Sequence, residues 1–156
     1  DPEDGGGRII GEVCHFVDLV EYLTGDELEE VFAHALGGPT AELHDTVAIT
    51  LRYKGGSIAS INYFSTGDKS VPKERVEVYG GGGIAVLDDF RQLTLTRGGK
   101  PRKIKKLSQA LAAFLRSVRT GAEPPISLTS LVSTTRATFA IEESLRTGRP
   151  VAVTQD

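Results

Sequence analysis

The chain has 156 residues, 39% of them hydrophobic and 25% charged, which is the balance of a globular domain with a core of its own. Its formal net charge of −3 argues against a nucleic-acid partner or an anionic membrane surface. A single cysteine excludes an internal disulfide framework and favours the cytoplasm, and the sequence contains neither a run of membrane-spanning length nor a signal peptide.

Methionine is absent from the sequence, which begins abruptly with Asp-Pro-Glu-Asp. Because a natural reading frame needs an initiator, we expect the chain to be a piece of a longer protein, unless processing has removed its start. Its length predicts one domain covering residues 1–156.

The first predicted element is a helix between Gly5 and Gly25, and Gly25 occupies a position that commonly ends a helix in the left-handed conformation. Apolar residues spaced by three and four predict a buried stripe, formed by Ile10, Val13, Cys14, Val17, Val20 and Leu23. The opposite face carries four polar residues, Glu12, His15, Asp18 and Tyr22. An imidazole beside two carboxylates suits acid/base chemistry, whereas the alternative interpretation is an ordinary solvated helix face.

Alternating apolar residues and short turns predict an antiparallel meander after this helix. Its strands are expected at Glu29–Leu36, His44–Tyr53, Ser57–Ser65, Glu74–Tyr79, Ile84–Asp88 and Leu93–Thr96. Two helices are expected to follow, at Ser108–Thr120 and at Ser127–Thr147, the second ending at Gly148. A last short strand is predicted at Val151–Val153.

Several patterns resemble functional motifs but are better explained by structure. The run from Gly80 to Ala85 formally satisfies a dinucleotide fingerprint, yet an alternating strand follows it, so we predict a hairpin turn and no cofactor-binding residue. Cys14 lies on the apolar stripe and is expected to be a small core residue. The basic segment Arg97–Lys106 is expected to be a solvated hairpin. No metal site is predicted, because His15, His34 and His44 lack close ligand spacing.

These elements predict an α+β fold, with a single mostly antiparallel sheet and helices packed on one face. Val47, Ile49 and Leu51 are expected to face the core. The opposite, open face is expected to carry small or aromatic residues, namely Ala48, Thr50, Ala59, Ile61, Tyr63 and Tyr79.

The order of these elements resembles the C-terminal domain of the Gfo/Idh/MocA family, which includes glucose–fructose oxidoreductase and inositol dehydrogenase. The resemblance covers nearly the whole chain and is carried by the Gly-rich first helix and by the segments ERVEVYGGGGIAVLDDF and ESLRTGRPV. In that family the first helix bears an Asp-x-Gly-x-His pattern that lines the substrate site. His15 matches its His, whereas the Asp falls on Gly11 and the Gly on Val13, with Glu12 one residue after the missing Asp.

The resemblance implies the substrate-binding half of an NAD(P)-dependent oxidoreductase acting on a sugar or polyol-like alcohol or carbonyl. A Rossmann domain carrying a Glu-Lys-Pro motif would precede it in the parent enzyme, and this piece alone would be inactive and bind no nicotinamide cofactor. We assign catalytic roles to His15 and Glu12, and substrate-binding roles to Arg8, Gly11 and Asp18.

The open sheet face would make a homo-oligomer contact, as it often does in the resembling family. The alternative function is a noncatalytic dimerisation domain whose active site has decayed, as the missing Asp at Gly11 would allow. The choice between NAD and NADP and the identity of the substrate are left open by these residues.

Overall fold

The structure is a computed structural model that describes residues 7–37, 45–105 and 127–154. The chain divides into two compact units, one formed by residues 1–66 with 126–156 and the other by residues 67–125. The assignment of the whole chain to one domain remains a prediction. The expected helix at Ser108–Thr120 and the residue His44 lie outside the described residues.

The first unit contains a four-stranded antiparallel sheet in the order β3-β2-β1-β8. The strands are β1 (Leu28–Ala35), β2 (Thr46–Tyr53), β3 (Ile58–Phe64) and β8 (Val151–Ala152). A tight turn through Gly56, at φ +90°, joins β2 to β3, as the Lys-Gly-Gly sequence predicts. The boundaries of all four strands therefore agree with the expected ones to within a few residues.

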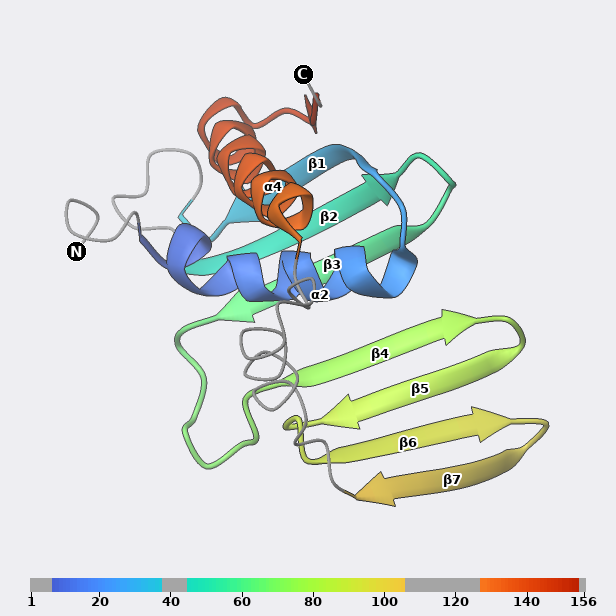
Figure 1. Cartoon of the computed structure of the whole chain (residues 1–156). Helices are drawn as coiled ribbons and strands as arrows, with labels where there is room; N and C mark the ends of the chain where they lie inside the picture. The colour runs from blue at the N-terminus through green and yellow to red at the C-terminus, as the bar shows by residue number, and fades with distance from the viewer. Residues whose placement is uncertain (1–6, 38–44, 106–126, 155–156) are drawn as a thin grey trace, which may run out of the picture. The chain divides into compact units, whose positions relative to one another are not determined.

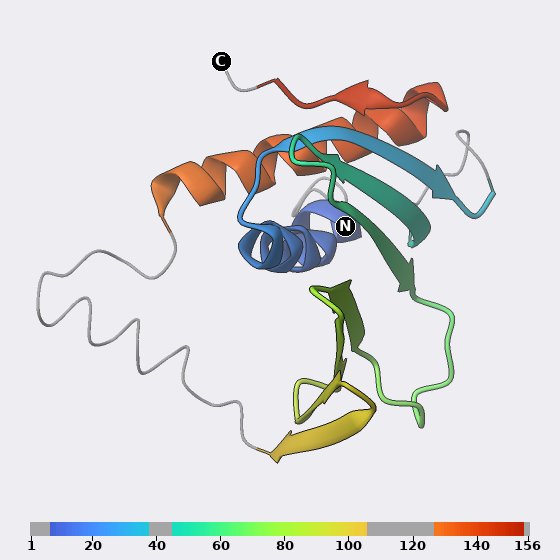
Figure 2. The ribbon, with the colours of Figure 1, turned by 90° about the vertical axis from the view of Figure 1, so that its right-hand side faces the viewer.

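Two helical segments cover one face of this sheet (Figures 1 and 2). The first consists of a π-helical turn, η1 (Ile9–Val13), that runs directly into α2 (Cys14–Thr24). The second is α4 (Leu128–Thr147), which begins where the Ser127 hydroxyl accepts a hydrogen bond from the Ser130 amide at 3.1 Å. Both α2 and α4 end at a left-handed glycine, Gly25 and Gly148, as predicted.

The core lies between these helices and the covered sheet face. Val47, Ile49 and Leu51 are each at most 1% exposed, which confirms their predicted orientation. On α4, Ala137, Ala140, Ile141 and Leu145 are buried, whereas Leu128 and Leu131 are 75% and 52% exposed.

The register of the hairpin corrects the expected composition of the open face. Ala59, Ile61 and Tyr63 lie directly opposite Leu51, Ile49 and Val47, so they share the core side of the sheet instead of the open side. Residues directly opposite each other on neighbouring strands point to the same face, and the turn length sets this register. Ala48 and Thr50 are exposed on the open face, as predicted. Their neighbours on that face include Phe32, His34, Ser60, Asn62 and Phe64.

The second unit contains a separate antiparallel meander in the order β4-β5-β6-β7. Its strands are β4 (Arg75–Gly80), β5 (Gly83–Asp88), β6 (Gln92–Arg97) and β7 (Lys100–Lys105). Gly81 and Gly82 connect β4 to β5 with φ +56° and +73°, a two-residue turn that confirms the predicted hairpin. The basic segment confirms the expected solvated hairpin, because β7 pairs with β6 after the turn at Gly98 and Gly99, and residues 97–103 are exposed.

The α+β class with antiparallel strands is confirmed, but the strands form two four-stranded sheets and not the single sheet expected. No ladder joins β3 to β4 in the described chain. The connection between them, residues 65–74, is polar and contains Pro72. It folds as a local turn, in which Asp68 accepts a hydrogen bond from the Ser70 amide at 2.8 Å. Unlike a two-residue turn, a connection of this length does not by itself set the two strands in hairpin register.

Candidate functional site

The first helix begins with a wide turn that changes which residues it buries. The Cys14 amide donates to the Ile9 carbonyl, five residues earlier, so this turn holds one residue more than an α-helical turn. Ile9, Val13 and Val17 are consequently at most 1% exposed, whereas Ile9 was not part of the predicted stripe. Leu23, predicted to belong to that stripe, is 47% exposed.

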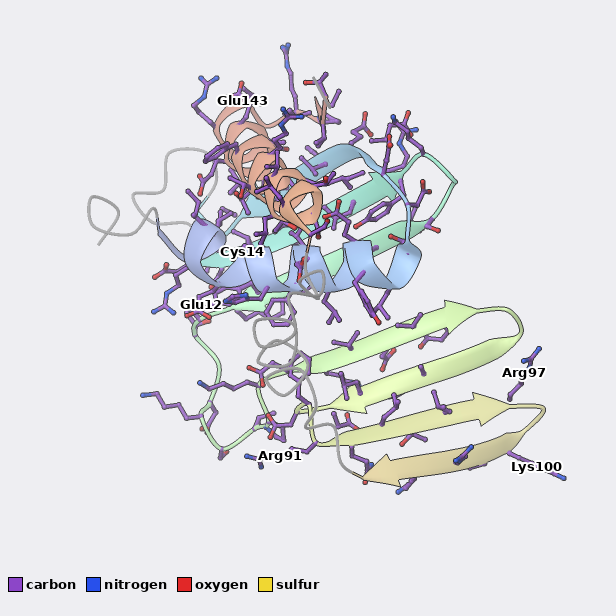
Figure 3. The ribbon with its side chains drawn as sticks, in the orientation of Figure 1. Glu12, Cys14, Arg91, Arg97, Lys100 and Glu143 are labelled. Atoms are coloured by element: carbon purple, nitrogen blue, oxygen red, sulfur yellow. The ribbon has the colours of Figure 1, made fainter. Side chains whose placement is uncertain are left out.

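Four of the five residues predicted for the site are exposed on this helix: Arg8, Gly11, Glu12 and His15. Glu12 lies in the wide turn, and the half-buried Cys14 is the first residue of α2 (Figure 3). A Cβ atom built on Gly11 would meet no heavy atom within 4 Å, so open space adjoins the helix backbone there. The His15 side chain is itself exposed, as an acid/base group that meets a ligand must be.

Arg8 is held by two groups from other segments. Its Nε lies 3.3 Å from Asp45 Oδ1, and its Nη1 donates a hydrogen bond to the Tyr63 hydroxyl at 3.2 Å. The hydrogen bond to Tyr63, and after it the negative charge of Asp45, raise the pKa of Arg8, so the guanidinium stays charged. The guanidinium therefore ties the entry of the helix to β3 and to the residue that precedes β2.

Tyr63 and Asp45 were not assigned to the site from the sequence. They lie 55 and 37 positions from Arg8 along the chain, so no local spacing connects them. The signal that would have placed Tyr63 is the register of the β2–β3 hairpin, which sets it on the helix-covered face opposite Val47.

The fifth predicted residue, Asp18, is half-buried and turned toward α4. Its Oδ1 accepts a hydrogen bond from the Ser130 hydroxyl at 3.2 Å. One turn further along α2, Glu21 accepts a hydrogen bond from the Thr134 hydroxyl at 3.3 Å. These two bonds join α2 to α4, so Asp18 contributes to helix packing as well as lying one turn from His15.

Other candidate groups in the described residues have structural explanations. Burial raises the pKa of the Cys14 thiol, which favours its protonated form. The His34 ring packs edge-on against Phe32, with centroids 4.4 Å apart and an interplanar angle of 72°. In residues 7–37, 45–105 and 127–154, no three His, Cys, Asp or Glu side chains are grouped to hold a metal ion.

The sequence of residues 1–86 matches the GFO/IDH/MocA C-terminal domain family, and the chain belongs to that family. Its helices within the described ranges include none long and apolar enough to cross a membrane.

Two curated relatives are oxidoreductases. Myo-inositol 2-dehydrogenase of Thermotoga maritima is 26% identical over 140 residues, which cover 78% of this chain and 42% of the relative. The uncharacterized oxidoreductase YrbE of Bacillus subtilis is 29% identical over 166 residues, covering 95% of this chain and 48% of the relative. This chain thus spans less than half the length of each relative.

Solved structures of oxidoreductases share the fold. An NAD binding oxidoreductase from Klebsiella pneumoniae superposes with a TM-score of 0.81 at 19% identity. The match covers all of this chain and 53% of that structure. At this identity the similarity establishes the fold, which is the α+β fold expected from the sequence.

Proposed function

We propose that this chain is the substrate-binding C-terminal half of an NAD(P)-dependent oxidoreductase that acts on the alcohol or carbonyl group of a sugar or polyol. The observation that carries the proposal is the exposed His15 on the first helix, at the position of the family's motif histidine. Membership in a family whose relatives are oxidoreductases supports it, as does the name of one relative, since myo-inositol is a polyol.

The roles follow from the exposed side of the first helix. His15 takes the hydroxyl proton of the substrate during oxidation and returns it during reduction. Glu12, an exposed carboxylate three residues earlier, orients the imidazole and balances its charge. Arg8 and Asp18 hold substrate hydroxyls, and the open space beside Gly11 leaves room for the ligand.

The nicotinamide cofactor supplies the hydride acceptor, and the described residues of this chain do not fit it. The glycine run that formally matches the dinucleotide fingerprint is the β4–β5 hairpin, where no helix N-terminus faces a phosphate. We therefore assign cofactor binding to a preceding domain in a longer protein located in the cytoplasm.

A noncatalytic dimerisation domain with a decayed site is the second candidate. The observation that favours it is Gly11, which stands where the family has an Asp. In both candidates we propose that the open face of the first sheet joins two copies of the chain. The side chain of Phe64, which is 64% exposed, supports that contact, because an interface between two copies would remove its apolar ring from water.

The test of the proposed function uses the full-length protein that contains this chain. It is incubated with a panel of sugars and polyols and with NAD⁺ or NADP⁺, and formation of the reduced nicotinamide is measured. Reduction that depends on one class of sugar or polyol supports the enzyme. No reduction with any member, from a protein that is folded and binds the coenzyme, supports the decayed site.

A further inference from the structure

Three side chains from separate segments meet where the first helix begins. Arg8 stands just before the wide turn, Asp45 stands just before β2, and Tyr63 lies near the end of β3. The guanidinium contacts both partners, at 3.3 Å to the Asp45 carboxylate and 3.2 Å to the Tyr63 hydroxyl. All three belong to the first unit, as do Gly11 and His15.

The hydrogen-bonding capacity of this group is not used up by its internal contacts. A guanidinium has five N–H donors, and the two contacts engage its Nε and Nη1 atoms. The Tyr63 hydroxyl accepts from Arg8, so its own proton remains available for donation. Asp45 offers acceptor oxygens beside these donors. Adjacent donors and acceptors of this kind match hydroxyl groups, which both donate and accept.

The charge of the group disfavours an anion. Asp45 neutralises Arg8 at 3.3 Å, and Glu12 lies near enough for its charge to act on the same guanidinium. One cation thus stands with two carboxylates, and a ligand carboxylate would have to compete with Asp45 for the guanidinium. A neutral ligand meets no such competition.

We propose that Tyr63 is a further ligand-contacting residue of this site, and that the Arg8–Asp45 pair makes the site select neutral hydroxylated ligands over anionic ones. This inference rests on the proposed function and narrows its substrate class. The side chain of Tyr63 suits the role, because its ring packs against the core while its hydroxyl reaches the exposed Arg8.

The test compares two matched pairs of probes, glucose with glucuronate and galactose with galacturonate, whose members differ only in a terminal hydroxymethyl or carboxylate group. Binding to the full-length protein is measured by calorimetric titration without added coenzyme, so that neither an alcohol nor a carbonyl group of the sugar is turned over. We expect at least one neutral sugar to bind about tenfold or more tightly than its uronate.

Two variants examine the named residues. Tyr63→Phe should weaken binding of the neutral sugar about fivefold, the usual effect of one lost hydrogen bond. Asp45→Asn should reduce the preference for the neutral sugar over its uronate about fivefold or more, since Arg8 then loses the carboxylate that contacts it. The matched controls are Tyr22→Phe, at an exposed tyrosine of α2, and Asp88→Asn, whose carboxylate pairs with Arg75 on the second sheet. Both controls should bind like the unmodified protein.

Tighter binding of the uronates, a Tyr63→Phe variant that binds like the unmodified protein, or no binding of any probe would overturn the inference. Different results would refute the proposed function and the ligand preference. The expected binding pattern without coenzyme reduction by any polyol would refute the oxidoreductase and retain the ligand preference. Coenzyme reduction by a polyol, with unchanged binding in both variants, would support the oxidoreductase and refute the ligand preference.

Discussion

The Ser144 hydroxyl of α4 accepts a hydrogen bond from the Ala33 amide of β1 at 3.0 Å. It also donates to the Arg149 carbonyl at 2.7 Å, and Ser144 is fully buried. The partner strand β8 pairs only with Glu30 and Val31, so no β8 residue lies opposite Ala33. A side chain of α4 therefore supplies the hydrogen-bond acceptor that the Ala33 amide of β1 does not find on β8.

Ser144→Ala should lower the free energy of unfolding by about 2 kcal/mol, because it leaves the buried Ala33 amide without a partner. Chemical denaturation measures the change. The control is Thr129→Ala, at an exposed position of the same helix, and should change stability by less than about 0.5 kcal/mol. Equal stability of the two variants would show that the amide finds another partner.

Gly55 is required by a close approach between the β2–β3 turn and Asp26. The Gly55 amide donates to Asp26 Oδ2, and the Glu27 amide donates to Oδ1 of the same carboxylate at 2.8 Å. A Cβ on residue 55 would lie 2.3 Å from Asp26 Oδ2 and displace the carboxylate.

Gly55→Ala should therefore lower the free energy of unfolding by about 1–3 kcal/mol, the range for losing charged hydrogen bonds. Thermal unfolding gives the measurement. Gly67→Ala is the matched control, since a Cβ there meets nothing within 4 Å. If both variants melt together, the Asp26 contact contributes nothing to stability.

Local sequence signals predicted most of the fold. The left-handed glycines Gly25 and Gly148 marked both helix ends, and paired glycines marked the β4–β5 turn. The predictions of which residues are buried failed where the sequence carries no local signal of the helical turn or of the strand register. One extra residue in the wide turn brought Ile9 into the core, and the hairpin register moved Tyr63 to the covered face.

In the candidate site, too, residues within one helix could be grouped from the sequence, whereas contacts between distant segments could not. Glu12 and His15 are three residues apart, so helical spacing sufficed to place them on one face, whereas Arg8 and Gly11 entered the site through the resemblance to the family's first helix. The contact between Asp18 and Ser130 joins residues 112 positions apart, and periodicity within one helix holds no information about it.

The isolated chain should show no nicotinamide binding. Its glycine run is a hairpin turn, and that run does not form the strand–turn–helix arrangement that holds a pyrophosphate. Calorimetric titration with NAD⁺ and NADP⁺ measures this directly. Micromolar binding of either cofactor would refute the assignment of cofactor binding to a preceding domain.

Two copies of the chain should associate through the open face of the first sheet. Thr50 lies within that face, opposite Phe32 on β1 and Ser60 on β3. Thr50→Arg should therefore convert a dimer to a monomer, because it places an unpaired charge in the contact. Sedimentation velocity measures the state. Thr129→Arg, at an exposed position of α4, should leave the dimer intact, and a monomeric unmodified chain at high concentration would contradict the proposal.

The last prediction concerns His15 in the full-length protein. His15→Asn should lower kcat by about a hundredfold or more, since general acid/base catalysis typically contributes that much. The side chain is exposed, so the substitution creates no core cavity and should leave the unfolding transition unchanged.

Glu12→Gln provides a graded comparison, because an orienting carboxylate acts only through the imidazole. It should cost less in kcat than His15→Asn and mainly move the pH–rate profile. The matched control is Glu77→Gln on the second sheet, where the carboxylate only accepts from Arg75 and Tyr79. Normal turnover and pH dependence in His15→Asn would show that this helix is a scaffold, because a proton-transfer group cannot be removed without slowing the step that it serves.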